Sequence, residues 1–333
     1  MREVAALARV STKTVSRVIN EQTGVGPEAI ERVRAAARTL GYRPNLTASS
    51  LRRSDRRSAT LGVLFEDLSN PFDSALLRAV EDRARQGGVL VLAGSDEDDP
   101  VLQQELLGSL AARRVDGLVV MAVGGHQDAL QRERERGTPM VLVDRPPTFA
   151  NTDCVTTTNR ESAREAIDQL AALGHRNIAF LGDRPTLWTS QERYTGYVEG
   201  LAGAGLRLRE DLVSTGLKGS DAAQAATAAL LDLADPPTAL FTAQNLVTVG
   251  AMRVLRERGL RDRVALVGFD DFPLADMVDP GITVVRQDVP KIGRTAAELV
   301  FTRIEGDRSP AIHAVVPAVL IRRGSGEIRP PTR

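Results

Sequence analysis

From residue 60 onward, short apolar runs alternate with amphipathic stretches long enough to form helices. A strand buried in a parallel sheet gives a continuous apolar run, and a helix packed on that sheet gives an apolar stripe. The alternation therefore predicts a doubly wound α/β architecture, and its two series, 61–143 and 155–267, predict two similar lobes. We expect strands at 61–65, 89–92, 117–121, 140–143, 155–157, 178–181, 239–241 and 264–267, and helices at 71–86, 100–113, 128–136, 160–173, 191–203, 222–233 and 247–258.

The N-terminal segment has helical periodicity instead. Ser11 is placed to cap a second short helix, Pro27 suits the first turn of a third, and Gly41 ends that helix. The segment is therefore predicted to be a three-helix unit. The apolar faces of its helices are expected to be Val4, Ala5, Leu7 and Ala8; Val15, Val18 and Ile19; and Ile30, Val33, Ala36, Ala37 and Leu40.

The second of these helices places hydroxyl, ammonium and guanidinium groups opposite its valines. Such groups bind phosphates and the edges of bases in a DNA groove. The helix is therefore a candidate for reading DNA. Its outward residues are Thr12, Lys13, Thr14, Ser16 and Arg17.

The distribution of charge supports a nucleic-acid partner for this segment only. The 333 residues have no net formal charge, yet residues 1–58 hold 12 Lys and Arg against 5 Asp and Glu, a net charge of +7 that the remainder balances with −7. Neutralisation of phosphates by Lys and Arg supplies most of the sequence-independent affinity for nucleic acids. On charge alone, a solvated basic surface is the alternative.

Composition excludes several other classes of protein. Cys154 is the single cysteine, and Met1 is followed by charged residues rather than by an apolar signal segment, so we expect a cytoplasmic protein. No apolar stretch reaches the ~18 residues of a membrane span. Three histidines and one cysteine argue against a metal site, and we expect no cofactor. His175 follows a predicted helix end, where a structural cap is the simplest role.

Three spaced motifs mark the N-terminal segment: V-A-x-L-A at 4–8, V-S-x-x-T-V-S-R-V-x-N at 10–20 and G-Y-x-P-N-x-x-A-x-x-L at 41–51. Together they resemble the N-terminal signature of the lactose-repressor (LacI/GalR) family of bacterial transcription regulators. By that resemblance, Thr12, Lys13 and Arg17 occupy the base-reading positions of a recognition helix. Thr14, Ser16 and Asn20 would contact phosphates.

The resemblance makes residues 45–58 a hinge. The stretch from Asn45 to Leu51 is too short and too polar to be a stable helix alone, and we expect it to fold on DNA. In the family, this helix pairs with its twin in the dimer and inserts a leucine into the minor groove, which here is Leu51 with Ala48 beside it. For Leu51, an ordinary buried linker residue is the alternative.

Two positions depart from the family pattern. Arg9 stands where most members have glycine, and a positive φ there would cost roughly 1 kcal/mol. Met1 directly precedes the first helix, where the family has further residues that include a capping threonine. We therefore expect a poorly capped first helix.

In open α/β sheets, ligands bind beyond the carboxyl ends of the strands, so the cleft between two lobes is the default site. Aromatic, carboxylate, amide and guanidinium groups at those ends suit a polyhydroxylated ligand. Each could equally cap a helix or join an ion pair. The candidates are Phe72, Asp73, Asp144, Arg193, Gln244 and Asp270.

The resemblance extends through this part of the chain, at S-N-P-F (69–72), R-V-D-G-L (114–118), L-G-H-x-x-I-A (173–179), R-x-x-G-Y (193–197) and G-F-D-D (268–271). These motifs are similar to effector-domain motifs of the family, which shares its fold with periplasmic sugar-binding proteins. The resemblance implies that Arg193 and Asp270 contact an effector and that Phe72 stacks on it. Gln244 departs from the family's Ala-Asn-Asp motif, and Asp73 replaces a residue that is often aromatic. We therefore expect a smaller or more polar ligand.

The sequence thus predicts an α/β protein with a three-helix helix-turn-helix headpiece (1–44), a hinge (45–58) and a two-lobed periplasmic-binding-protein-like domain (59–333). The N-lobe would comprise about 60–158 plus 289–316, and the C-lobe about 159–288 plus 317–325.

The implied function is that of a homodimeric repressor, without enzymatic activity, that binds near-palindromic operator DNA under control of a small-molecule effector such as a sugar. A cytoplasmic sugar-acting enzyme and a pure sugar-binding protein are the alternatives. Asp144 and Asp270 could serve as an acid/base pair, which product formation would reveal. The sequence contains no Walker-type loop and no G-x-S-x-G elbow to support an enzyme.

Overall fold

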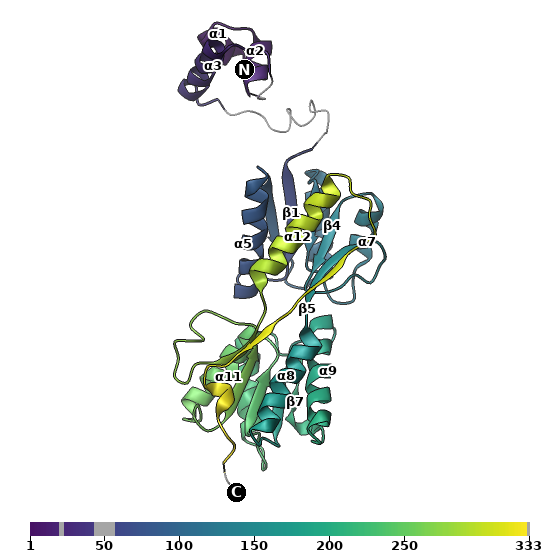
Figure 1. Ribbon diagram of the computed structural model, residues 1–333, viewed down its shortest axis with the longest axis vertical. Coiled ribbons are helices and arrows are strands. Elements are labelled where there is room, and N and C mark those ends of the chain that lie inside the picture. Colours follow the sequence, from purple (N-terminus) through teal and green to yellow (C-terminus); the bar gives the residue numbers. More distant parts are fainter. Residues whose placement is uncertain (20–22, 43–56, 332–333) are drawn as a thin grey trace. The chain divides into compact units, whose positions relative to one another are not determined.

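The computed structural model describes residues 1–19, 23–42 and 57–331. The chain divides into two compact units, Met1–Ser58 and Ala59–Arg333 (Figure 1). Among the described residues, no helix is both long and apolar enough to cross a bilayer.

The first unit contains the three predicted helices, α1 (Arg2–Ala8), α2 (Thr12–Ile19) and α3 (Pro27–Thr39). The Ser11 hydroxyl accepts the Thr14 N–H at 3.0 Å, which confirms the predicted cap of α2. Pro27 occupies the first turn of α3, also as predicted. The buried core of the unit is Val4, Ala5, Ala8, Val15, Val18, Val33 and Ala36.

Two residues predicted to lie on the apolar faces are exposed instead. Leu7 is 53% exposed, because in a helix with 3.6 residues per turn it lies well off the face that carries Val4 and Ala8. Leu40 is 43% exposed, because it follows the last turn of α3 as its C-cap. The turn after α1 places Arg9 in the left-handed region at φ 52°, and Met1 supplies no side-chain cap to α1.

The second unit begins with a parallel six-stranded sheet in the order β11-β5-β4-β3-β1-β2. Helices α5 (Pro71–Gln86) and α12 (Val289–Ile304) cover one face, and α6 (Pro100–Ala112) and α7 (Asp128–Glu135) cover the other. One strand differs from its prediction: β2 is not buried, and its Leu90 is 63% exposed because the strand lies at the sheet edge. The strands are β1 (Thr60–Phe65), β2 (Leu90–Ser95), β3 (Gly117–Val120), β4 (Met140–Val143), β5 (Asp153–Thr157) and β11 (His313–Val316).

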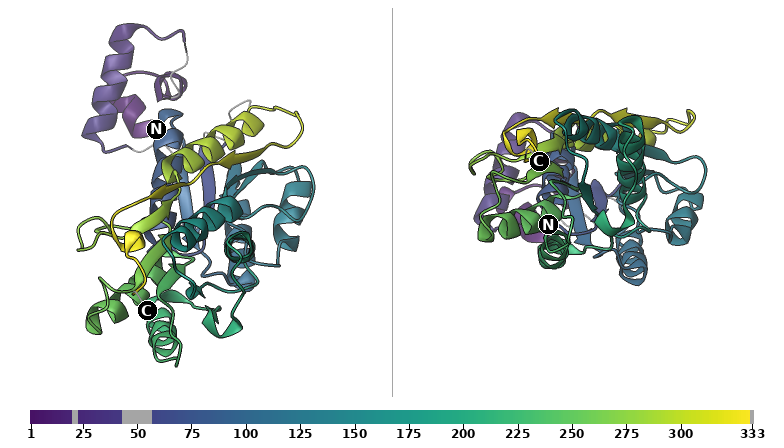
Figure 2. Two further views of the ribbon diagram at one scale, coloured as in Figure 1. Left: turned by 60° about the horizontal axis from the view of Figure 1, so that its bottom comes forward. Right: turned by 90° about the horizontal axis from the view of Figure 1, so that it is seen from below.

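The second sheet has the order β12-β10-β9-β8-β6-β7, and only β12 runs antiparallel to its neighbour. Helices α8 (Asn159–Ala172) and α9 (Trp188–Gly203) pack on one face, and α10 (Gly219–Leu231) and α11 (Asn245–Glu257) on the other. Both views in Figure 2 show helices around the strands. The strands are β6 (Ile178–Leu181), β7 (Val213–Ser214), β8 (Ala239–Thr242), β9 (Ala265–Phe269), β10 (Thr283–Arg286) and β12 (Val319–Ile321). Two single-turn helices, η1 (Glu210–Leu212) and η2 (Ser325–Glu327), complete this lobe.

Within residues 59–331, the chain crosses between the two sheets after β5, after β10 and after β11. The last crossing is the yellow strand that runs from one lobe to the other in Figure 1. The apolar pattern did not predict β7, β10, β11, β12 or α12 as elements. Strands β7, β11 and β12 lie at sheet edges and are largely half-buried or exposed, so they lack the continuous apolar run of a buried strand.

Candidate functional site

A cavity of about 400 Å³ lies between the two sheets of the second unit. Six of its lining residues directly follow strands, three from each sheet, so the carboxyl ends of both sheets meet here. The volume is in the range of small-ligand pockets. The residues at strand ends are Glu66, Met121 and Asp144 from the first sheet, and Ala243, Asp270 and Gln287 from the second.

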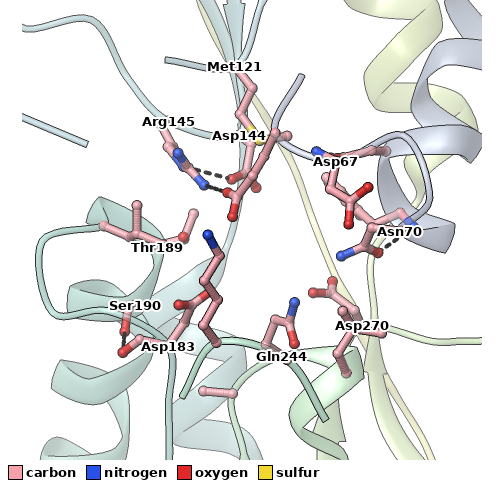
Figure 3. A pocket seen from close by; sticks show the side chains of 18 of the residues that line it. Asp67, Asn70, Met121, Asp144, Arg145, Asp183, Thr189, Ser190, Gln244 and Asp270 are labelled. Atoms are coloured by element: carbon pink, nitrogen blue, oxygen red, sulfur yellow. Dashed lines mark hydrogen bonds and ion pairs between the residues drawn. The ribbon is translucent and has the colours of Figure 1, made fainter. Parts of the chain in front are cut away.

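Figure 3 shows the two walls of the cavity facing each other. The first lobe contributes Asp67, Asn70, Met121, Asp144 and Arg145, and the second lobe contributes Asp183, Thr189, Ser190, Gln244 and Asp270. A ligand in this space would therefore contact both lobes at once.

All six residues singled out as effector contacts line this one cavity, although they are spread over nearly 200 positions of the chain: Phe72, Asp73, Asp144, Arg193, Gln244 and Asp270. Phe72 is also part of the core of the first lobe and only 9% exposed, which leaves little of its ring for stacking. Their role as effector contacts stays a prediction.

Asp144 and Asp270 occupy equivalent positions at the ends of β4 and β9. Both have left-handed backbone, with φ 66° and 70°, and each donates its N–H at 2.9 Å to the neighbouring strand, to Val155 and Val285 respectively. This conformation costs a non-glycine residue on the order of 1 kcal/mol, and such strain is concentrated at functional sites. It turns each carboxylate toward the cavity (Figure 3).

Arg193 is held rigidly in the wall. Its Nε donates to Asn159 Oδ1 at 2.8 Å, and its Nη1 donates to the Ala243 carbonyl at 2.9 Å. The guanidinium also lies 3.8 Å from the centre of the Phe269 ring, a cation–π contact. Asp270 is 3.4 Å from Nη1 and accepts Gln287 Nε2 at 2.6 Å. The Arg193–Asp270 pair is thus oriented before any ligand arrives.

The glycine of the R-x-x-G-Y motif explains how α9 places Arg193. A Cβ on Gly196 would lie 2.2 Å from the Arg160 carbonyl oxygen, so only glycine lets α9 pack this close to α8. Tyr197 then donates its hydroxyl to the Ile178 carbonyl at 2.9 Å. The motif therefore fixes a helix pair on the sheet with Arg193 at the cavity end.

An ion network that the sequence analysis did not find borders the cavity. Arg145 pairs with Glu66 and Asp98 of its own lobe, and Arg184 of the other lobe pairs with the same two carboxylates. Glu66 directly follows β1, so the argument that pointed to Asp144, a polar residue at the carboxyl end of a strand, could also have pointed to Glu66. Nothing in the local sequence links Arg184 to Glu66, which lies 118 positions away.

Burial changes the pKa of two carboxyl groups in the first-lobe wall. Desolvation, assisted by the negative charges of Asp144 and Glu66, raises the pKa of Asp73 to about 8, although the hydrogen bond from the Asp67 N–H and the charge of Arg145 oppose it. Desolvation also raises the pKa of Asp144, although the charges of Arg145 and Arg193 oppose it.

Gln244 and Asn245 make hydrogen bonds within the protein. Gln244 Oε1 accepts the Val247 N–H at 3.1 Å and so caps α11. Asn245 Nδ2 donates to Asn70 Oδ1 at 2.8 Å, a hydrogen bond between the lobes. Gln244, which was predicted to contact the effector, thus also caps a helix, and Asn245 joins the two walls.

In the first unit, α2 presents the side chains that were predicted to read DNA. Val15 and Val18 are buried, while Thr12, Lys13 and Arg17 are exposed. Thr14 and Ser16 are half-buried, and Thr14 Oγ1 lies 2.9 Å from the Ser11 hydroxyl. Four predicted DNA contacts lie outside the described residues: Asn20, Asn45, Ala48 and Leu51.

His175 is structural, as expected, but it does not bind the helix carbonyls for which it was predicted. It is fully buried, with Nδ1 2.8 Å from Thr238 Oγ1 and Nε2 2.8 Å from the Ile328 carbonyl. A carbonyl only accepts, so Nε2 carries the proton, and desolvation lowers the pKa of the ring. Cys154 is buried, and burial raises the pKa of its thiol to about 12, so it is not a nucleophile.

Family models match two parts of the chain. The model of bacterial regulatory proteins of the lacI family matches residues 1–45, and a periplasmic binding protein-like domain matches residues 167–326. The transcriptional regulator PtxS of Pseudomonas plecoglossicida is 35% identical, over 98% of this chain and 95% of the relative. The transcriptional regulator CelR of Thermobifida fusca is 34% identical, over 97% of each chain.

Solved structures share the same architecture. The lac repressor dimer bound to operator and the anti-inducer ONPF superposes with a TM-score of 0.86 at 26% identity, over 97% of each chain. A complex of the regulator CelR with cellobiose superposes with a TM-score of 0.75 at 32% identity, over 97% of this chain and 98% of the other. The relatives are transcriptional regulators and not enzymes.

Proposed function

The chain belongs to the lacI family of bacterial transcriptional regulators, and we propose that it acts as a homodimeric repressor whose affinity for operator DNA is set by a polyhydroxylated effector bound between its lobes. The observation that carries the proposal is that one face of α2 is buried and the other presents polar side chains to solvent. Its valines are buried in the headpiece core, so Thr12, Lys13 and Arg17 are left exposed on a capped helix.

On DNA, Arg17 would contribute most to base reading. A guanidinium can bind the two acceptors of a guanine in the major groove, a contact worth about 1–3 kcal/mol of discrimination. Lys13 and Thr12 would read neighbouring bases. Thr14, Ser16 and Asn20 would bind phosphates, and the stretch of Asn45, Ala48 and Leu51 would enter the minor groove as a hinge helix.

A dimer follows from the size of the headpiece. One recognition helix reads only a half-site, and two-fold symmetry of the protein matches a near-palindromic operator. The lac repressor, which superposes over 97% of each chain, was solved as a dimer on operator. We extend that arrangement to this chain.

The cavity is the effector site in this proposal. Arg193 and Asp270 are buried, mutually oriented and aimed at the space between the lobes, where their donors and acceptors suit hydroxyl groups. CelR, which is similar over nearly the whole chain, was solved with cellobiose. A sugar or related polyol is therefore the ligand class that we assign.

Coupling to DNA would run through the lobes. A ligand that contacts both walls favours one closure of the lobes over another, and the three crossings between the sheets would be the hinges. The effector shifts DNA affinity only by its differential binding to the two closures. Such coupling amounts to about 1–3 kcal/mol, or roughly 5–150-fold in affinity.

Selection of random duplexes by the purified protein, followed by sequencing of the bound pool, tests the proposal. We expect enrichment of a two-fold symmetric site with a deformable central step. Arg17→Ala should lose that selectivity, while Arg38→Ala should keep it, because Arg38 lies on α3, 68% exposed and paired with Glu31. An unselected pool, or an unchanged consensus for Arg17→Ala, would contradict the assignment of α2.

A further inference from the structure

We propose that the effector carries a primary ammonium group next to its hydroxyls, and that Asp73 and Asp144 bind that group. The ligand class would then be an amino sugar or an amino alditol. This inference rests on the proposed role of the cavity as the effector site.

The charges of the cavity wall are unbalanced. Seven carboxylates line it against three cations, Arg145, Arg193 and Lys218. Two of these cations are already bound within the protein, since Arg145 pairs with Glu66 and Asp98, and Arg193 with Asp270. An anionic ligand, such as a sugar acid or a sugar phosphate, would add like charge to a wall that is already negative.

The excess of negative charge in the wall is localised at Asp73 and Asp144. Asp73 is 3% exposed, and the hydrogen bond described for its carboxylate is the one from the Asp67 N–H to Oδ2, at 2.8 Å. Asp144 is 9% exposed, and its ion pair in the described residues is with Arg145 Nε at 3.7 Å, which is beyond hydrogen-bond distance. Two buried carboxylates therefore face the cavity without a cation that is hydrogen-bonded to them.

Among the described residues, Arg145 makes no hydrogen bond to Asp73 or Asp144, because its two terminal nitrogens donate elsewhere. Nη1 donates to Asp98 Oδ1 at 2.8 Å and to the Ala122 carbonyl at 2.9 Å, and Nη2 donates to Glu66. Nε has no hydrogen-bond acceptor among the described residues, although it is buried. The side of Arg145 that faces Asp144 is thus the side without a hydrogen bond.

The other charged groups around Asp73 and Asp144 do not balance the negative charge of these two carboxylates either. Glu66 and Asp67 adjoin it from the end of β1, and Asp270 and Arg193 approach Asp144 from the second lobe. Lys218 lines the cavity from the start of α10, and the described ion pairs do not join it to Asp73 or Asp144. Burial is the main cause of the raised pKa of Asp73, and the nearby charge of Arg145 offsets it only in part.

A primary ammonium group meets these requirements better than a metal ion does. It is a compact cation with three N–H donors, enough to bind both carboxylates at once. In the described part of the chain, no three His, Cys, Asp or Glu residues are arranged to hold a metal ion. The hydroxyl groups of the same ligand would reach Arg193, Asp270 and Gln244 on the opposite wall.

Matched ligands test this inference directly. Titration calorimetry at pH 6.5 would compare amines with their hydroxyl counterparts: glucosamine with glucose, galactosamine with galactose, mannosamine with mannose, and glucamine with sorbitol. We expect at least one amine to bind 10-fold or more tightly than its counterpart. Its binding should release up to one proton, measured by repeating the titration in buffers of different ionisation heat, because the ammonium group stabilises ionised Asp73.

Variants assign the preference to the two carboxylates. Asp73→Asn and Asp144→Asn should each abolish the advantage of the amine and the proton release. Asp183→Asn, which removes a carboxylate from the opposite wall, should keep both. Lys218→Met should leave the preference intact or increase it, because it removes a like charge.

Equal binding of amine and hydroxyl partners, tighter binding of gluconate or glucose 6-phosphate, or failure of all the amines would each overturn the inference. Selection of operator DNA without ligand distinguishes a failure of the ammonium inference from a failure of the proposed function. If a symmetric site is enriched and a neutral sugar or sugar acid releases it, the regulator assignment stands and the ammonium inference falls.

Discussion

Arg145 and Arg184 come from different lobes and bind the same two carboxylates, those of Glu66 and Asp98. Arg145 Nη1 lies 2.8 Å from Asp98, and Arg184 Nη2 lies 2.7 Å from Glu66. The side chains of Arg145 and Asp98 are each 6% exposed, so solvent screens this part of the network little. These four groups together carry no net charge, and their pairing joins the lobes beside the cavity.

Arg184→Met should therefore loosen the closure of the lobes, because it removes the one charge that the second lobe contributes to Glu66 and Asp98. Pulsed electron resonance between spin labels at Gln86 and Glu257, in a Cys154→Ala background, would report the distance between lobes. We expect a longer and broader distance distribution. The matched control is Arg209→Met, whose ion pairs with Asp211 and Asp235 lie within the second lobe. Identical distributions for all three proteins would show that the network does not hold the closure.

Arg9→Gly should stabilise the headpiece. Arg9 has φ 52°, a conformation that costs a residue with a Cβ about 1 kcal/mol, and glycine avoids that cost but loses more backbone entropy on folding. We expect a net gain of up to about 1 kcal/mol, seen as slower amide hydrogen exchange in α1 and α3. Arg9→Ala, which keeps the Cβ, should show no such gain, and equal protection in the two variants would contradict this explanation.

Asp73 should make the unliganded protein less stable as pH rises. Its pKa is about 8 in the folded state and 3.8 in the reference state, so the folded state holds a proton that the unfolded state has lost between these values. The free energy of unfolding then falls from about pH 4 to pH 8. Asp96, whose pKa burial raises to about 6, and Asp144 act in the same direction, whereas His175 opposes them below its ordinary pKa.

Urea unfolding at pH 5, 6, 7 and 8 would measure this slope. Asp73→Asn should flatten it and raise stability most at pH 8, because the amide never ionises. An unchanged slope in Asp73→Asn would mean that its carboxyl group stays ionised in the folded protein.

Asp270→Asn should weaken effector binding by roughly 10-fold or more. The amide keeps the shape of the side chain but removes the charge that faces Arg193 Nη1 at 3.4 Å and weakens an acceptor toward a ligand hydroxyl. Calorimetry with the compound that releases operator would measure the loss, and the melting temperature would show that the fold is retained. Unchanged affinity would remove Asp270 from the effector contacts.

Met277→Asp should disrupt the proposed dimer. Met277 is 77% exposed and Leu274, in the same loop, is 64% exposed, so this loop is the surface on which we test the proposed dimer contact. Sedimentation should show a shift from dimer to monomer. Leu208→Asp is the control, because Leu208 is a 39% exposed apolar residue elsewhere on the same lobe. A dimer that survives Met277→Asp would place the interface on another surface.

Local features of this protein can be predicted from the amino-acid sequence alone. Each helix of the headpiece leaves a periodic apolar pattern and most strands of the lobes leave a continuous apolar run, because such patterns are carried by neighbouring residues of one element. Ser11 as a cap, Pro27 in a first turn and α5 at Pro71–Gln86 needed no other part of the chain. The expectation that ligands bind beyond the carboxyl ends of the strands also led to the six candidate residues of the cavity.

Which of these groups are partners depends on how the chain folds in three dimensions. The pairing of Arg184 with Glu66, of Asn245 with Asn70 and of β11 with β5 joins residues more than 100 positions apart. The charge balance of the wall depends on those pairings, since the sequence counts carboxylates but does not say which cation each one meets. The shortage of cations at Asp73 and Asp144 arises from the fold, because burial and pairing are properties of neighbours in space.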